Sequence, residues 1–289
     1  MKELKFIKYI SKRPLFKGIG DDCAVLNYKK DKYLLATTDM IVEGVHFMKN
    51  ALPYQIGWKA MAVNISDIAS MGGVPKHALI SVGIPRKKPM RYLLDIAKGV
   101  EAAARKFRIT IIGGDTNASA KTVVNVALMG EVEKRLLLRR SGARTGDLIF
   151  VTGALGEGKR KHLTFIPRLH EARFLTKRFK VNSMIDLSDG LAMDLNRIAD
   201  SSGTGARVCE SLIPLSEHSD PLDKAIEAGE DFELLFTASI KESRKIIKRM
   251  GEDLPITLIG EIVAKKYGVK IIEESGKEKT LKSEGFRHF

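Results

Sequence analysis

The sequence is poor in cysteine, and this scarcity limits the kinds of site it can contain. Cys23 and Cys209 are the only cysteines among 289 residues, and neither belongs to a CxxC pair or a Cys–His cluster. This spacing argues against a disulfide framework and against a structural zinc site. The sequence predicts two free thiols in a reducing compartment.

Long apolar runs are also lacking. No stretch approaches the roughly 18–20 apolar residues that span a bilayer, and the opening "MKELKFIKYISKRPLF" is too interrupted for a signal peptide. We therefore expect a soluble, cytoplasmic protein with no membrane partner. The 44% hydrophobic content is enough for one large or two medium domain cores.

Negative charge is in deficit. Lysine and arginine number 49 against 35 acidic residues, which gives a formal net charge of +14. Such an excess suits anionic partners such as nucleotides, phosphorylated metabolites or nucleic acid, but a solvated surface rich in Lys and Glu is the favoured explanation. The basic runs at 159–162 and 265–270 are short, and no predicted helix carries a continuous basic stripe. We expect no nucleic-acid partner.

Short β-rich runs alternate with amphipathic helical patterns, which is typical of an α/β or α+β fold. Turn residues gather in "RRSGARTGDLI" (139–149), where we predict a boundary between domains 1–142 and 143–289. Helices are predicted at 58–71, 91–107, 241–251 and after Asp189. Strands are predicted at 77–85, 108–114 (buried), 122–132, 147–153, 231–239, 256–264 and 268–273, with a strand–turn–strand unit at 32–47.

Carboxylates recur beside strand ends and glycine turns. Asp21 and Asp22 are adjacent in "GIGDDCAVL" (18–26), and further members of the set are Asp39, Asp67, Asp115, Asp186, Asp189, Glu230 and Asp231. Two like charges about 4 Å apart repel by ~4 kcal/mol at an effective dielectric constant near 20. Mg²⁺ relieves such repulsion, because it prefers oxygen ligands and bridges carboxylates to phosphates. Taken singly, each aspartate could equally be a loop tip, a turn residue or, for Asp189, a helix N-cap.

One glycine-rich segment has the appearance of a phosphate-binding loop. "GALGEGKR" (153–160) follows a predicted strand and matches G-x-x-x-x-G-K, but Arg160 stands where a Ser or Thr hydroxyl is required. We therefore do not interpret it as a P-loop. Similarly, "GIGDDC" has no third glycine and is not a dinucleotide fingerprint.

Seven collinear motifs resemble those of the thiamine-monophosphate kinases, in a superfamily with aminoimidazole ribonucleotide synthetase and selenophosphate synthetase. They are "GIGDDCAVL", "TTDMIVEGVHF", "AVNISDIASMGG", "IIGGDTN", "RSGARTGDLIFVTGALG", "MIDLSDGLAMDL" and "AGEDFELLF". The resemblance implies an N-terminal α/β domain whose strands form a dimer barrel, and a C-terminal α+β domain. It further implies a homodimer that binds ATP and several Mg²⁺ ions in the cleft between the domains and phosphorylates thiamine monophosphate.

The resemblance also assigns roles to individual positions. Magnesium ligands would be Asp22, Thr37, Thr38, Asp39, Asp67, Asp115, Asp186 and Asp189. ATP contacts would be Thr37, Gly114, Asp115, Arg140 and Ser188, and thiamine phosphate contacts would be His46, Glu230 and Phe286. The chain departs from the family pattern at Asn117, where a second Thr is common, and in a short 156–182 segment.

No catalytic base is expected. A phosphate acceptor with a second pKa of about 6 is already ionised at neutral pH, so metals and Arg140 would supply the electrostatics. Alternatives are a cyclo-ligase, a selenophosphate synthetase, a carbamoyl-transferring hydrogenase-maturation protein or a basic nucleic-acid binder. A selenophosphate synthetase would need a reactive cysteine, whereas we expect Cys23 to be a buried apolar residue. A hydrogenase-maturation protein would need a C-terminal cysteine, and this chain ends "RHF".

Overall fold

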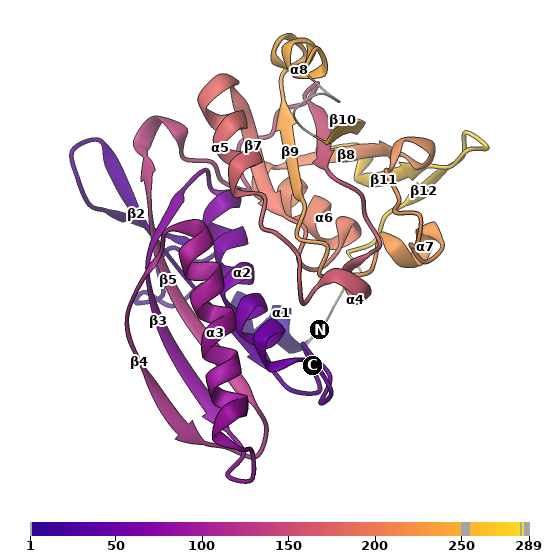
Figure 1. The fold of residues 1–289 in the computed structure, drawn as a ribbon. Coiled ribbons are helices and arrows are strands. Elements are labelled where there is room, and N and C mark those ends of the chain that lie inside the picture. The colour runs from indigo at the N-terminus through magenta and orange to yellow at the C-terminus, as the bar shows by residue number, and fades with distance from the viewer. Residues whose placement is uncertain (1, 250–254, 284, 286–289) are drawn as a thin grey trace. The chain divides into compact units, whose positions relative to one another are not determined.

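The computed structural model describes residues 2–249, 255–283 and 285 (Figure 1). The chain is mixed α/β and folds as two compact units. The five-stranded unit comprises residues 23–137 and 161–169; the seven-stranded unit comprises residues 1–22, 138–160 and 170–289. The chain passes from one unit to the other after residues 22, 137, 160 and 169. The predicted domain boundary at 142/143 stays a prediction.

The five-stranded unit is a sheet with two long helices packed on one face (Figure 1). The strand order is β1-β2-β5-β3-β4, antiparallel except for the parallel β3–β4 pair. Its elements are β1 (Ala24–Asn27), β2 (Lys32–Val42), α2 (Pro53–Ser70), β3 (Val74–Ile84), α3 (Met90–Phe107), β4 (Thr110–Ala118) and β5 (Val123–Glu133).

The packing of this unit follows from strand alternation and two glycines. Alternate residues of β5, among them Val124, Val126 and Leu128, are fully buried against α2. Gly57 of α2 and Gly99 of α3 let the two helices touch backbone to backbone. A Cβ at Gly99 would lie 1.9 Å from the Tyr54 carbonyl oxygen, and one at Gly57 would lie 2.0 Å from that of Ile96.

Two predictions for this unit are wrong. In the unit predicted at 32–47, the strand is β2 and a turn follows at residues 44–46, but no second strand follows: only an isolated bridge joins Glu43 to Phe47. The buried strand predicted at 108–114 is β4, which is exposed along its whole length in the single chain, with Ile111 and Ile112 accessible to solvent. Apolarity therefore predicted a strand, but not its place at the edge of an open sheet.

The seven-stranded unit has the order β12-β11-β8-β10-β6-β9-β7. Its strands are β6 (Leu148–Thr152), β7 (Val181–Asp186), β8 (Thr204–Cys209), β9 (Leu234–Ala238), β10 (Ile256–Ala264), β11 (Val269–Ile272) and β12 (Glu278–Thr280). Its helices are α1 (Lys2–Ile10), α4 (Gly158–Lys161), α5 (Leu169–Arg178), α6 (Leu191–Ser202), α7 (Leu222–Ala225) and α8 (Ile240–Ile247).

Helix α6 covers one face of this sheet, burying Leu191, Leu195 and Ile198. Phe150 of β6 and Phe236 of β9 are register partners, and their rings stack with centroids 5.2 Å apart. Neither cysteine is in a disulfide bond, and Cys23 is buried as predicted. Within the described ranges, no helix combines the length and apolarity needed to cross a membrane.

Candidate functional site

In the five-stranded unit, the motif residues of β2 face those of α2. The Thr37 hydroxyl donates to Asp67 Oδ2 at 2.6 Å, and the Asp39 backbone N–H donates to Asn64 Oδ1 at 3.0 Å. Thr37 and Asp39 share one face of β2 because strand side chains alternate, whereas Asn64 and Asp67 share one face of α2 because they are three residues apart. The fold thus gathers carboxylate, hydroxyl and amide oxygens, which are the ligand types that Mg²⁺ prefers.

Two other predicted residues of this unit lie on the opposite face of the sheet. Asp39 is in register with Val126, then Ile80, then Gly114, so Asp115 points away from the face that carries Asp39. There Asp115 accepts a hydrogen bond from the Asn117 amide at 2.7 Å. The Thr38 hydroxyl contacts Asn125 on that same side, at 3.3 Å. Only the backbone of Thr38 remains close to the Asp39 group.

Gly114 is required by this arrangement. A Cβ there would lie 1.8 Å from the Ile80 carbonyl oxygen, so no other residue fits against β3 at this point.

In the seven-stranded unit, Asp22 forms an ion pair with Arg140. The Asp22 carboxylate is 1% exposed, and its Oδ1 accepts from Arg140 Nε at 2.9 Å and from Nη2 at 2.5 Å. Burial disfavours the Arg140 charge, but Asp22, Asp194 and Asp186 outweigh that effect and raise the pKa of the guanidinium. The neighbouring Asp21 is paired separately: it accepts from the Arg139 guanidinium and, at 3.0 Å, from the Arg140 N–H. The two adjacent aspartates thus each have their own arginine.

A second arginine organises the loop that follows β7. Arg197 of α6 pairs with Asp189 and, at 2.6 Å, with the fully buried Asp194, which also accepts from the Asp189 N–H at 3.1 Å. Burial raises the pKa of Asp194, while Arg197 opposes the rise. Asp189 is not the N-cap of α6; that position is Gly190, with no side-chain cap bond. Asp186 ends β7 and is 2% exposed.

These ion pairs change the electrostatic account of the aspartates. Across the part of the chain that is described, no three His, Cys, Asp or Glu side chains gather as a metal site. In the seven-stranded unit, guanidinium groups pair directly with aspartates that the sequence predicted to be neutralised by Mg²⁺. Arg139, Asp194 and Arg197 were missed in the sequence analysis; the pairs "RR" at 139–140 and Asp194/Arg197, spaced as i,i+3 on a helix, were the available signals.

His46 lies in a tight turn after β2. Its Nδ1 accepts from the Val42 N–H at 3.1 Å, so in the neutral ring the proton is on Nε2. The His46 carbonyl accepts from Nζ of Lys59 at 2.7 Å, a completely buried lysine of α2. The same Nζ lies 2.6 Å from His162 Nδ1. Lys59 and His162 thus join the His46 turn to segment 161–169; the sequence analysis did not identify either residue. Trp58 also contacts this segment, because its Nε1–H donates to the Phe165 carbonyl at 2.8 Å.

His162 gives the five-stranded unit a pH-dependent stability. Burial, with the Lys59 charge, lowers the pKa of His162 from 6.5 to about 4. Between those values the unfolded chain binds a proton that the folded chain excludes, so stability falls as pH drops from about 6.5 to 4. The wild type should have a higher free energy of unfolding than His162→Gln at pH 7, and this difference should be about 1 kcal/mol smaller at pH 5. The figure is half of what the pKa change alone gives, because His162 is partly exposed to solvent. Urea unfolding of the wild type and His162→Gln at both pH values measures this, and an equal difference at pH 7 and pH 5 would contradict it.

Of the remaining predicted substrate contacts, the structure describes Glu230 but not Phe286. Glu230 has φ of 72°, and its N–H donates to the Ser188 carbonyl at 2.8 Å, so these two predicted contacts are adjacent. Phe286 lies outside the described residues. Gly285 is described, and a Cβ there would lie 2.3 Å from the Asp189 carbonyl oxygen.

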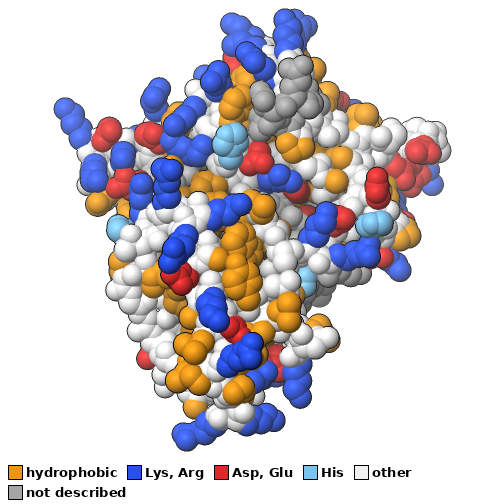
Figure 2. Space-filling model, viewed as in Figure 1, with side chains coloured by type: hydrophobic (Ala, Val, Ile, Leu, Met, Phe, Trp, Pro, Cys, Tyr) orange, Lys and Arg blue, Asp and Glu red, His pale blue; other side chains and the backbone are white. Residues whose placement is uncertain are grey.

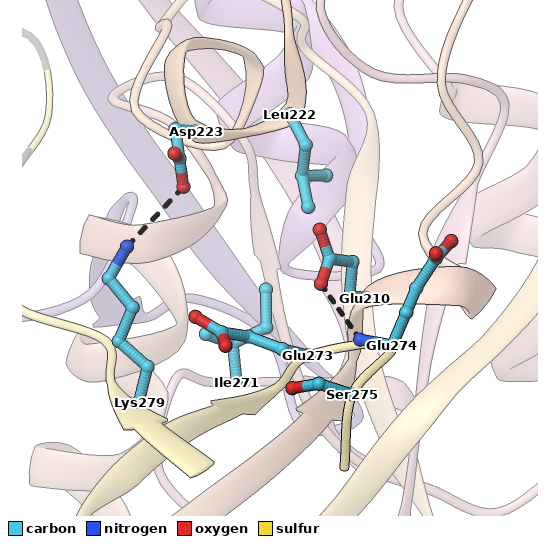
Figure 3. Close-up of a pocket in the computed structure, with 8 residues that line it drawn as sticks. All are labelled: Glu210, Leu222, Asp223, Ile271, Glu273, Glu274, Ser275 and Lys279. Carbon is cyan, nitrogen blue, oxygen red and sulfur yellow. Dashed lines mark hydrogen bonds and ion pairs between the residues drawn. The ribbon is translucent and has the colours of Figure 1, made fainter. Parts of the chain in front are cut away.

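A surface pocket elsewhere in the seven-stranded unit does not fit a phosphorylated substrate. It has a volume of about 300 Å³ and is lined by Glu210, Asp223, Glu273, Glu274 and Lys279, with Leu222, Ile271 and Ser275 (Figure 3). Four carboxylates against one ammonium repel phosphate, and no predicted site residue lines the pocket. On the face drawn in Figure 2, lysine and arginine side chains are scattered, with acidic side chains among them.

Comparison with known proteins identifies the family. The family model "AIR synthase related protein, N-terminal domain" matches residues 20–132, and the corresponding C-terminal domain model matches residues 153–272. The thiamine-monophosphate kinase of Buchnera aphidicola (Acyrthosiphon pisum) is 35% identical, over 99% of this chain and 97% of its own length. That of Aquifex aeolicus is 33% identical, over 99% and 98% respectively.

Solved structures agree. "AaThiL complexed with AMPPCP and TMP" superposes with a TM-score of 0.88 at 32% identity, covering all of this chain and 98% of that one. The sequence motifs, the two α/β units and the full-length matches therefore lead to one conclusion. This chain belongs to the thiamine-monophosphate kinase family.

Proposed function

We infer that this protein transfers the γ-phosphoryl group of ATP to thiamine monophosphate, giving ADP and thiamine diphosphate. The observation that carries this inference is the likeness, over the whole chain, to a structure described with AMPPCP and TMP bound. In this reaction an oxygen of the acceptor phosphate attacks the γ-phosphorus, and the bond from that phosphorus to the β-phosphate oxygen breaks. Because the acceptor is already ionised at neutral pH, no side chain has to remove a proton.

The residues present suit a magnesium-dependent reaction. We propose Thr37, Asp39 and Asp67, with the Thr38 backbone, as magnesium ligands in the five-stranded unit, and Asp22, Asp186 and Asp189 as ligands in the seven-stranded unit. All are hard oxygen donors. Bound magnesium would neutralise phosphate oxygens that otherwise repel each other. We propose that more than one Mg²⁺ ion binds.

We propose Arg140, Ser188, Gly114, Asp115 and Thr37 as ATP contacts, and His46, Glu230 and Phe286 as thiamine phosphate contacts. Arg140 is suited to this role because Asp22 fixes its guanidinium through two hydrogen bonds and its charge is maintained. His46 is suited because the Val42 contact at Nδ1 places the proton of the neutral ring on Nε2, and an N–H group is the kind of donor that a phosphate oxygen accepts from.

A homodimer forms part of the proposal. In one chain Asp115 and Asp39 lie on opposite faces of the sheet, so they cannot bind the same ion there. The exposed strand β4, with Ile111 and Ile112, offers an edge that a second copy would cover. We propose that Asp115 acts in a site completed by the partner chain.

The assay is direct. The purified protein, incubated with ATP, Mg²⁺ and thiamine monophosphate, should form thiamine diphosphate and an equal amount of ADP. Omitting Mg²⁺ should abolish both, and thiamine without its phosphate should not be phosphorylated. Formation of ADP without thiamine diphosphate, or no turnover at all, would refute the inference.

A further inference from the structure

The glycine-rich segment 153–158 is built as an anion cradle, although it is not a P-loop. The backbone N–H groups of Gly156, Glu157 and Gly158 all point at one position, the carboxylate of Asp231, with N–O distances of 3.0–3.1 Å. Successive N–H groups that converge in this way form the kind of nest that binds phosphate in other proteins. Here a carboxylate of the same chain fills it.

The glycines of the segment are required because other parts of the chain lie close against them. Gly156 has φ of +88°, and a Cβ there would meet the Ser219 Cβ at 2.7 Å. A Cβ at Gly158 would lie 2.2 Å from the Gly229 carbonyl oxygen. The helix after the loop, α4, has only four residues, so it supplies no long helix dipole toward a phosphate. The loop is therefore shaped to fit its own chain, at Ser219 and at residues 229–231.

The segment that the cradle holds is strained. Glu230 and Phe232 have φ values of 72° and 51°, a conformation that is unfavourable for residues other than glycine. On one side the Glu230 and Phe232 N–H groups donate to the Ser188 and Leu187 carbonyls, at 2.8 and 2.9 Å. On the other side Asp231 is held by the cradle. Glu230 therefore projects from a turn fixed at both sides.

A second carboxylate anchors the same connection. Buried Glu233 accepts from the Thr152 hydroxyl at 2.6 Å, and that hydroxyl oxygen accepts from the Leu234 N–H at 2.8 Å. Thr152 ends β6, directly before the glycine-rich segment. Burial raises the pKa of Asp231 to about 6, with Glu233 contributing in the same direction, so the carboxylate is ionised at neutral pH.

We propose that Asp231 is a positioning residue: its carboxylate fills the 156–158 anion cradle and thereby holds Glu230 in the orientation that binds thiamine monophosphate. This proposal rests on the function inferred above. It assigns the glycine-rich segment to substrate positioning rather than to nucleotide binding.

Kinetics of two variants test the proposal. Asp231→Asn keeps the side-chain size but removes the charge that three N–H donors require, and Asp231→Ala leaves the cradle open. Both should raise the KM for thiamine monophosphate by about tenfold, with a smaller change in the KM for ATP, as expected for loss of charge-assisted hydrogen bonds. Asp223→Ala is the matched control in the same unit, since its side chain is 82% exposed.

Rescue by a small anion separates positioning from general loss of structure. Formate should enter the cradle of Asp231→Ala, lower its KM toward the wild-type value and raise its melting temperature. Chloride at equal ionic strength, and formate with the wild type or Asp223→Ala, should do neither. An unchanged KM in both Asp231 variants, or no response to formate in Asp231→Ala, would overturn the proposal.

The two inferences fail separately. If the wild type does not phosphorylate thiamine monophosphate, the proposed function is wrong, and the positioning role for that substrate falls with it. The thermal response of Asp231→Ala to formate then still decides whether the cradle exists. If the wild type is active and formate stabilises the variant without altering its KM, the cradle is real but the positioning role is wrong. Circular dichroism of Asp231→Asn establishes that the fold persists.

Discussion

Replacing Asp22 by asparagine should lower kcat by about a hundredfold or more, which corresponds to ~2.7 kcal/mol or more of transition-state stabilisation. The asparagine side chain still has an oxygen that can accept from the Arg140 guanidinium. It lacks the negative charge that would bind magnesium and that holds Arg140 in place. The free energy of unfolding should fall less, by about 1–2 kcal/mol, because Asp186 and Asp194 still face Arg140. Steady-state rates at saturating ATP, Mg²⁺ and thiamine monophosphate, beside urea unfolding, measure the two effects.

The neighbouring aspartate provides the comparison. Asp21→Asn removes an ion pair to Arg139, whose side chain is 42% exposed, and should change kcat by only a few-fold. Asp22→Asn with wild-type turnover would show that Asp22 is neither a magnesium ligand nor needed to hold Arg140. Equal losses in both variants would show that the turn as a whole, rather than the Asp22 charge, supports the reaction.

Replacing Asp67 by asparagine should raise the Mg²⁺ concentration for half-maximal rate by about tenfold or more, since a neutral amide is a weaker Mg²⁺ ligand than a carboxylate. The amide oxygen can still accept from the Thr37 hydroxyl, so stability should change by only about 1 kcal/mol. The measurement is a Mg²⁺ titration of the initial rate at fixed, saturating ATP and thiamine monophosphate.

A carboxylate distant from the motifs serves as the control. Asp31 is exposed in the same unit, and Asp31→Asn should leave the Mg²⁺ dependence unchanged. If Asp67→Asn titrates with Mg²⁺ like the wild type, the proposed ligand set of the five-stranded unit is wrong. A lower kcat with an unchanged Mg²⁺ requirement would point instead to a role for the Thr37–Asp67 hydrogen bond in aligning β2 with α2.

Periodicity and turn chemistry predicted most of the secondary structure. The helix expected at 91–107 is α3, Met90–Phe107, and the strand expected at 122–132 is β5, Val123–Glu133. Local patterns succeed here because each element buries one regular stripe of side chains. They failed after the turn at 44–46, where an isolated bridge stands in place of a second strand, and for β4, whose exposure depends on strand order.

The residues themselves determined the family and the kind of chemistry, through seven motifs, aspartates that recur beside strand ends and glycine turns, and the lack of a nucleophile or base set. Only the tertiary structure decided how those aspartates are neutralised and which way they point. Asp22 and Arg140 are 118 positions apart, and Asp231 meets a loop that lies 73 to 75 positions before it. Charge pairing and strand register act through space, and single-sequence patterns do not record such distances.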